Sequence, residues 1–167
     1  MRKLNFLKTI VDFVWIMTII AAPFLILFLG FVIIDDKPLG MTLKINGVEL
    51  NVVDLKTKIL LLFLIISSIM IVYSLFLFRK ILRLFQIKKI FDSEVINNFN
   101  KIGILLMLSS FTVGIPNLLI QIMNKSTSLD LGMNPYVMIF CLGLFFLVLK
   151  EVFTIAKNQK EENELTI

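Results

Sequence analysis

The sequence predicts an all-α membrane protein with four transmembrane helices, both termini in the cytoplasm, and a short external β-hairpin between the first two helices. Three observations predict this fold: four long uncharged stretches, an Asn-Gly turn between alternating residues, and an uneven distribution of Lys and Arg. The uncharged stretches are residues 13–34, 59–78, 102–124 and 131–149. We expect them to form one membrane domain over residues 1–167.

Each stretch has the length of a membrane span. An α-helix rises about 1.5 Å per residue, so about 20 apolar residues cross a hydrocarbon core of about 30 Å. No Asp, Glu, Lys or Arg interrupts any of the four stretches. Lipid offers the backbone no hydrogen-bond partners, so each stretch should be helical there. A soluble four-helix bundle is the alternative, but it requires polar faces at helical period, which these stretches lack.

The composition narrows the functions that the chain can have. Hydrophobic residues make up 58% of it, which is typical of membrane proteins. The one cysteine, Cys141, lies inside the fourth stretch, so an intramolecular disulfide is excluded. The absence of His removes His-based metal sites and Ser-His or Cys-His catalysis. We expect no catalytic residues, no metal and no cofactor, and we interpret the protein as not an enzyme.

The connection 35–58 contains the only clear strand signal. Residues alternate between apolar and polar on both sides of Asn46-Gly47, a pair that strongly favours a two-residue hairpin turn. Such a turn would place Ile45 opposite Val48, Lys44 opposite Glu49 and Leu43 opposite Leu50. The hairpin either ties the first two spans together or acts as an external sensor or ligand lid.

The connection 79–101 begins as an amphipathic helix, with Arg79, Lys80 and Arg83 on one side. It lies on the membrane surface or extends the second span. A new helix should start near Asp92, where Asp92 or Ser93 can act as the N-cap. This connection either anchors the topology or docks a soluble partner.

The distribution of Lys and Arg predicts the orientation. The N-terminal segment, the connection 79–101 and the tail 150–167 together hold twelve, whereas the connections 35–58 and 125–130 hold five. Because positive residues are enriched on the cytoplasmic side, both termini and the central connection should be cytoplasmic. The protein is therefore expected in the cell membrane. In a cell that has two membranes, this is the cytoplasmic (inner) one.

Polar side chains within the spans are the candidate binding site. Those in the third span recur at helical spacing on one face, and two serines of the second span lie seven residues apart. They either bind the helices to one another, at about 1 kcal/mol per hydrogen bond, or form a small-molecule site or hinge near Pro116. The residues are Ser67, Ser74, Ser110, Asn117 and Gln121.

The tail combines an acidic cluster with two apolar side chains. Such an end can dock on a basic groove of a partner, or it can fold back on Arg79, Lys80 and Arg83. Exposed ion pairs are weak, so the apolar side chains should decide whether docking is specific. The docking residues would be Glu161, Glu162, Glu164, Leu165 and Ile167.

Two segments resemble the bacterial membrane proteins grouped as domain of unknown function 2975. One is the closing Glu-Glu-Asn-Glu-Leu-Thr-Ile of residues 161–167, and the other runs from Ile90-Phe91 through Val95 to Lys101-Ile102-Gly103. The four-span layout also agrees. Family members often carry a Gly where the last helix leaves the membrane, whereas this chain has Ile155-Ala156.

The resemblance implies no biochemical activity, because the family has none established. Its members are often encoded beside a small helix-turn-helix regulator of the Cro type, which implies a membrane partner for a DNA-binding protein. Our leading hypothesis is a regulatory membrane protein that sequesters or signals to such a cytoplasmic regulator, without binding nucleic acid itself. The alternative is a small transporter or toxin-immunity protein with its polar site along the third span. The expected partners are the lipid bilayer and that regulator. Whether the chain also forms a homo-oligomer is left open.

Overall fold

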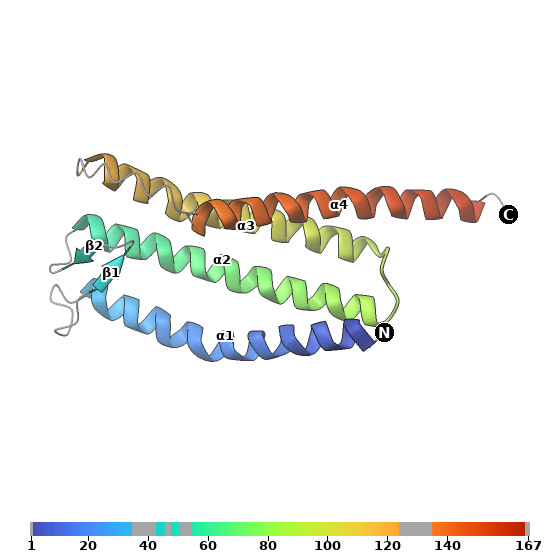
Figure 1. Ribbon diagram of the computed structural model, residues 1–167, viewed down its shortest axis with the longest axis horizontal. Coiled ribbons are helices and arrows are strands. Elements are labelled where there is room, and N and C mark those ends of the chain that lie inside the picture. Colours follow the sequence, from blue (N-terminus) through green and yellow to red (C-terminus); the bar gives the residue numbers. More distant parts are fainter. Residues whose placement is uncertain (1, 35–42, 46–47, 51–54, 124–134, 166–167) are drawn as a thin grey trace.

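A computed structural model describes residues 2–34, 43–45, 48–50, 55–123 and 135–165. Apart from two short strands, the described elements are four helices that run side by side along one long axis (Figure 1). All four are long and apolar enough to cross a membrane, which confirms this part of the predicted fold. The helices are α1 (Arg2–Ile34), α2 (Leu55–Gln86), α3 (Ser93–Met123) and α4 (Pro135–Leu165).

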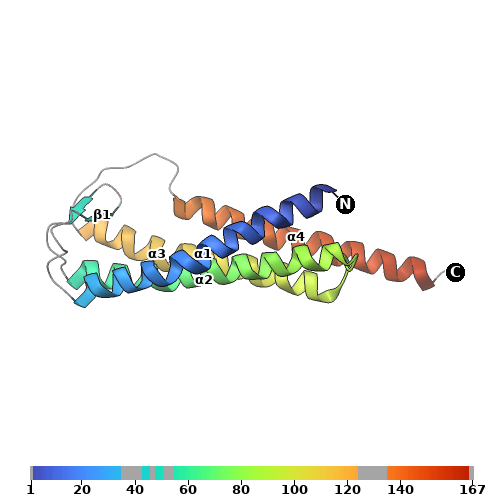
Figure 2. The ribbon, with the colours of Figure 1, turned by 90° about the horizontal axis from the view of Figure 1, so that it is seen from below.

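The helices follow one another in space in the order of the sequence. In the described part of the chain, the helix pairs whose backbones lie close together are α1 with α2, α2 with α3, and α3 with α4. The helices α2 and α3 form the centre, and α4 also reaches α2 through the aromatic pairs Phe78–Phe146 and Phe85–Phe153. The C-terminal end of α4 extends beyond the other helices, as two perpendicular views show (Figures 1 and 2).

The segment after the second predicted span continues α2. The helix runs without a break to Gln86, which makes Arg79–Gln86 an extension of the span rather than a separate surface helix. Its apolar side remains packed beyond the uncharged stretch, because Ile81 and Leu84 are both buried. Two residues beyond the end of the helix, Lys88 adopts a positive φ of 61°, a conformation frequent just after helix C-termini.

The next helix, α3, begins with a side-chain cap. The backbone N–H of Glu94 donates to Oδ1 of Asp92 at 3.0 Å, so Asp92 satisfies one of the free donors of the first turn. Asp92 is one of the two caps that the sequence predicts. From there α3 continues to Met123 and passes through Pro116.

A core of apolar side chains lies where α2, α3 and α4 meet. The residues Ile81, Val95 and Ile102 are almost fully buried in it. The ring of Phe99 lies 5.1 Å from that of Phe153 and 6.0 Å from that of Phe146, measured between centroids. Aromatic pairs at these separations stabilise the α3–α4 contact.

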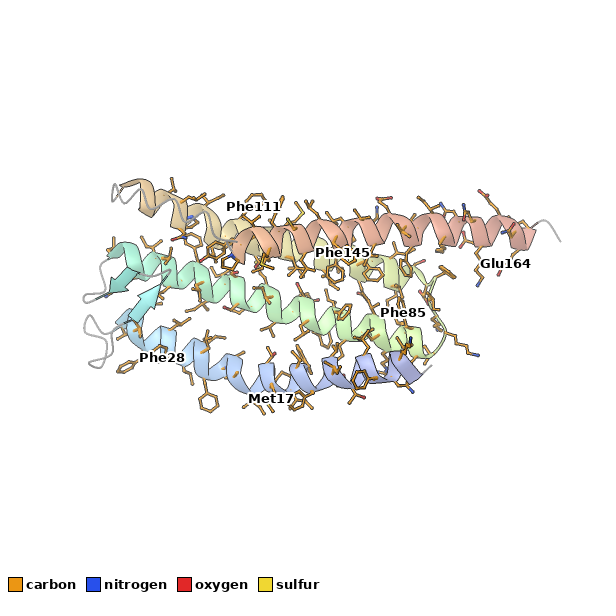
Figure 3. The ribbon with its side chains drawn as sticks, in the orientation of Figure 1. Met17, Phe28, Phe85, Phe111, Phe145 and Glu164 are labelled. Carbon is orange, nitrogen blue, oxygen red and sulfur yellow. The ribbon has the colours of Figure 1, made fainter. Side chains whose placement is uncertain are left out.

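The outer surface of the helices is apolar. Large side chains such as Met17 and Phe28 lie on the exposed side of α1 (Figure 3). Phe24 and Leu27 of the same helix are 71% and 70% exposed. Such surfaces are favourable against hydrocarbon and costly against water. Length, hydropathy and surface together indicate a multi-pass membrane protein.

Two short strands lie between α1 and α2 in the chain. The strands β1 (Leu43–Ile45) and β2 (Val48–Leu50) pair antiparallel, with Leu43 opposite Leu50 and Ile45 opposite Val48. The Asn46-Gly47 turn lies outside the described residues. The complete hairpin and its position on the external side of the membrane therefore stay predictions, as does the cytoplasmic location of both termini.

Candidate functional site

The intramembrane serines form a contact between α2 and α3. The Oγ atoms of Ser67 and Ser109 lie 2.9 Å apart, and Ser67 Oγ also donates to the backbone carbonyl of Ser109 at 3.2 Å. Both residues are buried, with 6% and 1% of their surface exposed. Hydrogen bonds between membrane helices contribute about 0.6 kcal/mol on average, so this pair helps to hold α2 against α3.

The other predicted site residues have different partners. Ser110 Oγ donates to the backbone carbonyl of Tyr136 at 2.7 Å, which joins α3 to α4. Ser74 Oγ donates to the carbonyl of Met70 in its own helix, at 2.9 Å. Asn117 is buried on α3, and the side chain of Gln121 lies outside the described residues. The serines among the predicted residues are therefore spread over two helix interfaces.

Ser109 was missing from the predicted site. The predicted site follows the face of the third span that carries Ser110, and Ser109 precedes Ser110 directly. Consecutive residues of a helix point about 100° apart, so two adjacent serines can serve two different neighbours. The Ser109-Ser110 pair was the signal that α3 has a helix on each of two sides.

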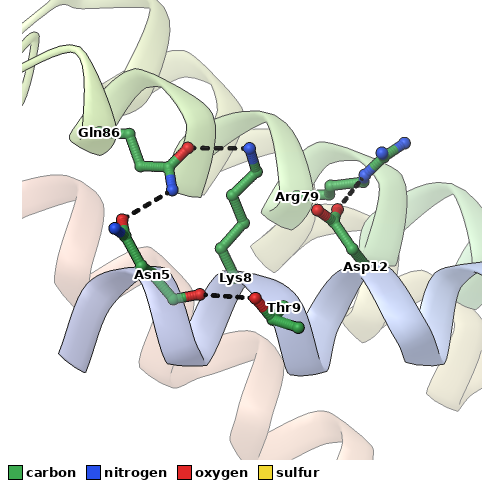
Figure 4. Close-up of polar contacts among 6 residues, drawn as sticks. All are labelled: Asn5, Lys8, Thr9, Asp12, Arg79 and Gln86. Carbon is green, nitrogen blue, oxygen red and sulfur yellow. Dashed lines mark hydrogen bonds and ion pairs between the residues drawn. The ribbon is translucent and has the colours of Figure 1, made fainter. Parts of the chain in front are cut away.

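A second group of polar side chains joins the helices at the end where the N-terminus lies (Figure 4). Asp12 of α1 forms an ion pair with Arg79 of α2. One turn further out, Lys8 Nζ donates to Gln86 Oε1 at 2.8 Å, and Gln86 Nε2 donates to Asn5 Oδ1 at 3.0 Å. These five side chains form what we call the α1–α2 polar contact.

The pairing of Asp12 with Arg79 was not predicted, although the sequence contains a signal for it. Asp12 directly precedes the first uncharged stretch, and Arg79 directly follows the second. Two consecutive antiparallel spans bring these two positions to the same depth in the membrane. Opposite charges at matching span ends are therefore a distance restraint that the sequence contains.

Two further contacts continue this polar layer to α3 and α4. Lys80 Nζ lies 2.5 Å from Glu94 Oε1, which joins α2 to α3. Lys157 Nζ donates to Ser93 Oγ at 2.6 Å, which joins α4 to α3. The side chains of Lys80 and Glu94 are 47% and 42% exposed, so their pairing is worth at most about 1 kcal/mol.

The predicted docking tail is a continuation of α4. Its charged side chains pair along the helix, with Lys157 3.6 Å from Glu161 and Lys160 3.6 Å from Glu164. Every residue from Asn158 to Leu165 is exposed. Two of the three basic residues to which the tail could fold back have other partners, because Arg79 pairs with Asp12 and Lys80 with Glu94. Ile167 lies outside the described residues.

An apolar cavity of about 600 Å³ lies between α1 and α2. Trp15 and Ala22 of α1 and Tyr73 of α2 line it. Two of the hydroxyl groups on its wall are used within the helices, because Thr18 donates to the carbonyl of Val14 and Ser68 donates to a carbonyl of α2. The cavity is therefore suited to hydrocarbon and offers little to a polar solute.

The described residues provide no evidence for metal or transport chemistry. Among them, no three His, Cys, Asp or Glu side chains gather closely enough to hold a metal ion. Cys141 is exposed on α4, within the apolar part of the helix. Neither the cavity between α1 and α2 nor a second, polar cavity between α3 and α4 is lined by Ser110 or Asn117. A transport or immunity site along the third span thus stays a prediction.

Comparison with known proteins gives one match. The family described as protein of unknown function (DUF2975) matches residues 9–167, essentially the whole chain. No curated protein and no solved structure matches the chain. The match includes the central connection and the acidic tail, the two segments that carry the resemblance in the sequence. The chain therefore belongs to the DUF2975 family of proteins of unknown function.

Proposed function

We propose that this protein is a non-enzymatic regulator of the cell membrane that holds a small cytoplasmic helix-turn-helix protein through the C-terminal end of α4. One observation carries the proposal. The residues Asn158–Leu165 remain helical, are exposed at every position, and extend past the ends of the other helices, with Glu164 close to the tip (Figure 3). We call these residues the α4 extension.

The α4 extension has the properties of a docking element. A helix that is polar all round gains nothing from packing and depends on weak side-chain pairs within it. This one has two such pairs, Lys157 with Glu161 and Lys160 with Glu164. It ends on Leu165, which is 87% exposed. A charged helix with an apolar end is preorganised to bind a partner, which lowers the ordering cost of association.

The charge of the α4 extension fits the proposed partner. Residues 158–165 contain three glutamates and one lysine, so the extension is acidic. A helix-turn-helix protein presents a basic surface to the phosphates of DNA. An acidic helix is complementary to that surface and would compete with DNA for it. Binding at the membrane would then withdraw the regulator from its operator.

The proposal requires a cytoplasmic C-terminus. The excess of Lys and Arg on the side of both termini supports this orientation, and it places the Asn46-Gly47 turn outside. The test uses the single variants Lys88→Cys and Asn46→Cys in a Cys141→Ser background, probed on intact cells with a membrane-impermeant thiol reagent. We expect labelling at position 46 alone. Labelling at position 88 alone would reverse the orientation.

Binding is tested with purified components. The full-length protein in detergent is immobilised, and the small helix-turn-helix protein encoded beside its gene is added after separate purification. We expect deletion of residues 161–167 to abolish capture. The triple variant Glu161→Gln/Glu162→Gln/Glu164→Gln should weaken capture about tenfold or more, because each exposed charge pair contributes up to about 1 kcal/mol.

The control for charge is Glu151→Gln, which neutralises an exposed glutamate of α4 outside the extension. It should leave capture unchanged. The unfolding midpoint of each variant should match that of the wild type, because the extension packs against no other helix. Equal capture by the wild type and the truncated form removes the α4 extension from the mechanism. A gene neighbourhood without such a regulator removes the proposed partner.

A further inference from the structure

An open cavity of about 340 Å³, lined mainly by polar and charged residues, lies between α3 and α4, in the region where α4 leaves the uncharged stretch. The first turns of α3 supply Ser93, Asn97 and Asn100 to its wall. The helix α4 supplies Lys150 and Lys157, which lie two turns apart. Lys150 is the first charged residue after the uncharged stretch 131–149, so the cavity lies at the depth of lipid headgroups.

The wall of this cavity is suited to an anion. Among the described residues that line it, two are cationic and none is acidic. The side-chain amides of Asn97 and Asn100 donate to no other residue in the described part of the chain. Lys157 donates to Ser93 at 2.6 Å, which holds its ammonium group at the edge of the cavity. Cations and amide donors together are a typical environment for phosphate.

Each of the two lysines also pairs with a glutamate that lies outside the cavity wall. Glu151 lies 2.5 Å from Lys150, and Glu161 lies 3.6 Å from Lys157. Their side chains are 62% and 59% exposed, so both are largely solvated, and neither lines the cavity. An ammonium group can exchange such an exposed partner for a phosphate at small cost.

We propose that this cavity binds a phosphate group, and that the headgroup of an anionic membrane lipid supplies it. The volume is at the small end of ligand pockets, so it admits a headgroup but not the acyl chains. Val148 and Val152 of α4 are 58% and 52% exposed, which offers an apolar surface to those chains. The site shares only Asn158 with the α4 extension, and it does not depend on the proposed regulator.

The experiment measures which lipids remain bound to the protein. Full-length protein is placed in nanodiscs with equal amounts of phosphatidylglycerol and phosphatidylcholine, released into neutral detergent, and weighed by native mass spectrometry. We expect the wild type to retain phosphatidylglycerol in preference to phosphatidylcholine. The double variant Lys150→Gln/Lys157→Gln should lower this retention on the order of tenfold, since each lysine near an anionic lipid surface contributes to the attraction by a similar amount.

The control Lys88→Gln/Lys89→Gln removes the same charge from exposed positions in the turn after α2, and it should retain the lipid. The variant Lys150→Arg/Lys157→Arg keeps the charge and should also retain it, which separates loss of binding from loss of folding. Inorganic phosphate at millimolar concentration should raise the thermal unfolding midpoint of the detergent-solubilised wild type only slightly.

Three results would overturn the proposal. The first is equal retention by the wild type and the Lys150→Gln/Lys157→Gln variant. The second is equal retention of phosphatidylcholine and phosphatidylglycerol by the wild type. The third is an unfolding midpoint that rises as much with inorganic phosphate alone as with phosphatidylglycerol. That result would assign the cavity to a soluble anion instead of a lipid.

Discussion

The contact between α3 and α4 differs from the contact between α1 and α2. Gly103 and Gly143 bring the backbones of α3 and α4 so close that an added Cβ at either position would lie 2.9–3.0 Å from the carbonyl oxygen of the other. The pair α1 and α2 instead encloses a cavity of about 600 Å³. Gly30 of α1 has no atom within 4 Å of its Cβ position.

The difference shows what holds helices together in lipid. Hydrocarbon is as apolar as a leucine side chain, so close backbone packing and hydrogen bonds must stabilise the contact. The pair α3 and α4 has close packing together with tilted aromatic pairs. The pair α1 and α2 has the α1–α2 polar contact at one end and a small buried cluster of Leu29, Val32 and Leu61 at the other. In the described chain, α1 therefore packs against a single neighbour, without the close backbone approach that joins α3 to α4.

The largest effect is expected from filling the glycine contact. In Gly103→Ala, the new methyl group would lie 2.7 Å from the Leu147 side chain and 2.9 Å from the Gly143 carbonyl, so α3 and α4 must separate. We expect a loss of about 1–3 kcal/mol in the free energy of unfolding, measured by denaturant titration in mixed micelles.

Gly30→Ala is the matched control for that substitution. It meets open space, and alanine favours the helix over glycine, so its stability should stay equal or rise by up to about 1 kcal/mol. If Gly103→Ala behaved like Gly30→Ala, the α3–α4 contact would not be the tighter one.

A smaller effect is expected at the Asp12–Arg79 ion pair. The two side chains are 28% and 40% exposed, so the coupling energy in a double-mutant cycle of Asp12→Asn and Arg79→Gln should be about 1 kcal/mol or less. Because α1 has few other contacts, its N-terminal turns should also exchange amide hydrogens faster in each single variant.

The Lys80–Glu94 pair provides the comparison for that cycle. It joins α2 to α3, which also share a packed core and the Ser67–Ser109 contact. The variant Lys80→Gln should therefore leave hydrogen exchange in both helices unchanged. Equal acceleration by Lys80→Gln and Arg79→Gln would show that α1 is no more loosely held than α3.

The smallest effect is expected from Ser67→Ala. It removes the hydroxyl that contacts both Oγ and the carbonyl oxygen of Ser109, and membrane proteins show an average of about 0.6 kcal/mol for an interhelical hydrogen bond. Ser68→Ala removes a hydroxyl that bonds only to the Leu64 carbonyl of its own helix, so unfolding should be nearly unaffected. Thermal unfolding of both variants in the same detergent would rank them, and a larger loss for Ser68→Ala would contradict the interhelical role.

The sequence alone was sufficient for the class of fold. Uninterrupted apolar stretches of about 20 residues must be helical in lipid because the backbone has no other partner there. For the same local reason, Asp92 could be predicted as a cap, since an N-cap depends on the two or three residues that follow it. Family membership was also recognisable, because it depends on the order of residues.

Only the tertiary structure decided which polar residues meet. The helical period places Ser110 on one face of α3 and Ser109 on another, but it does not say which helix lies against either face. The close approach of Gly103 to Gly143 and the pairing of Asp12 with Arg79 likewise depend on how the helices are arranged. Periodicity describes one helix at a time, whereas a site needs the relative position of two, and in lipid the hydrophobic pattern does not choose between neighbours.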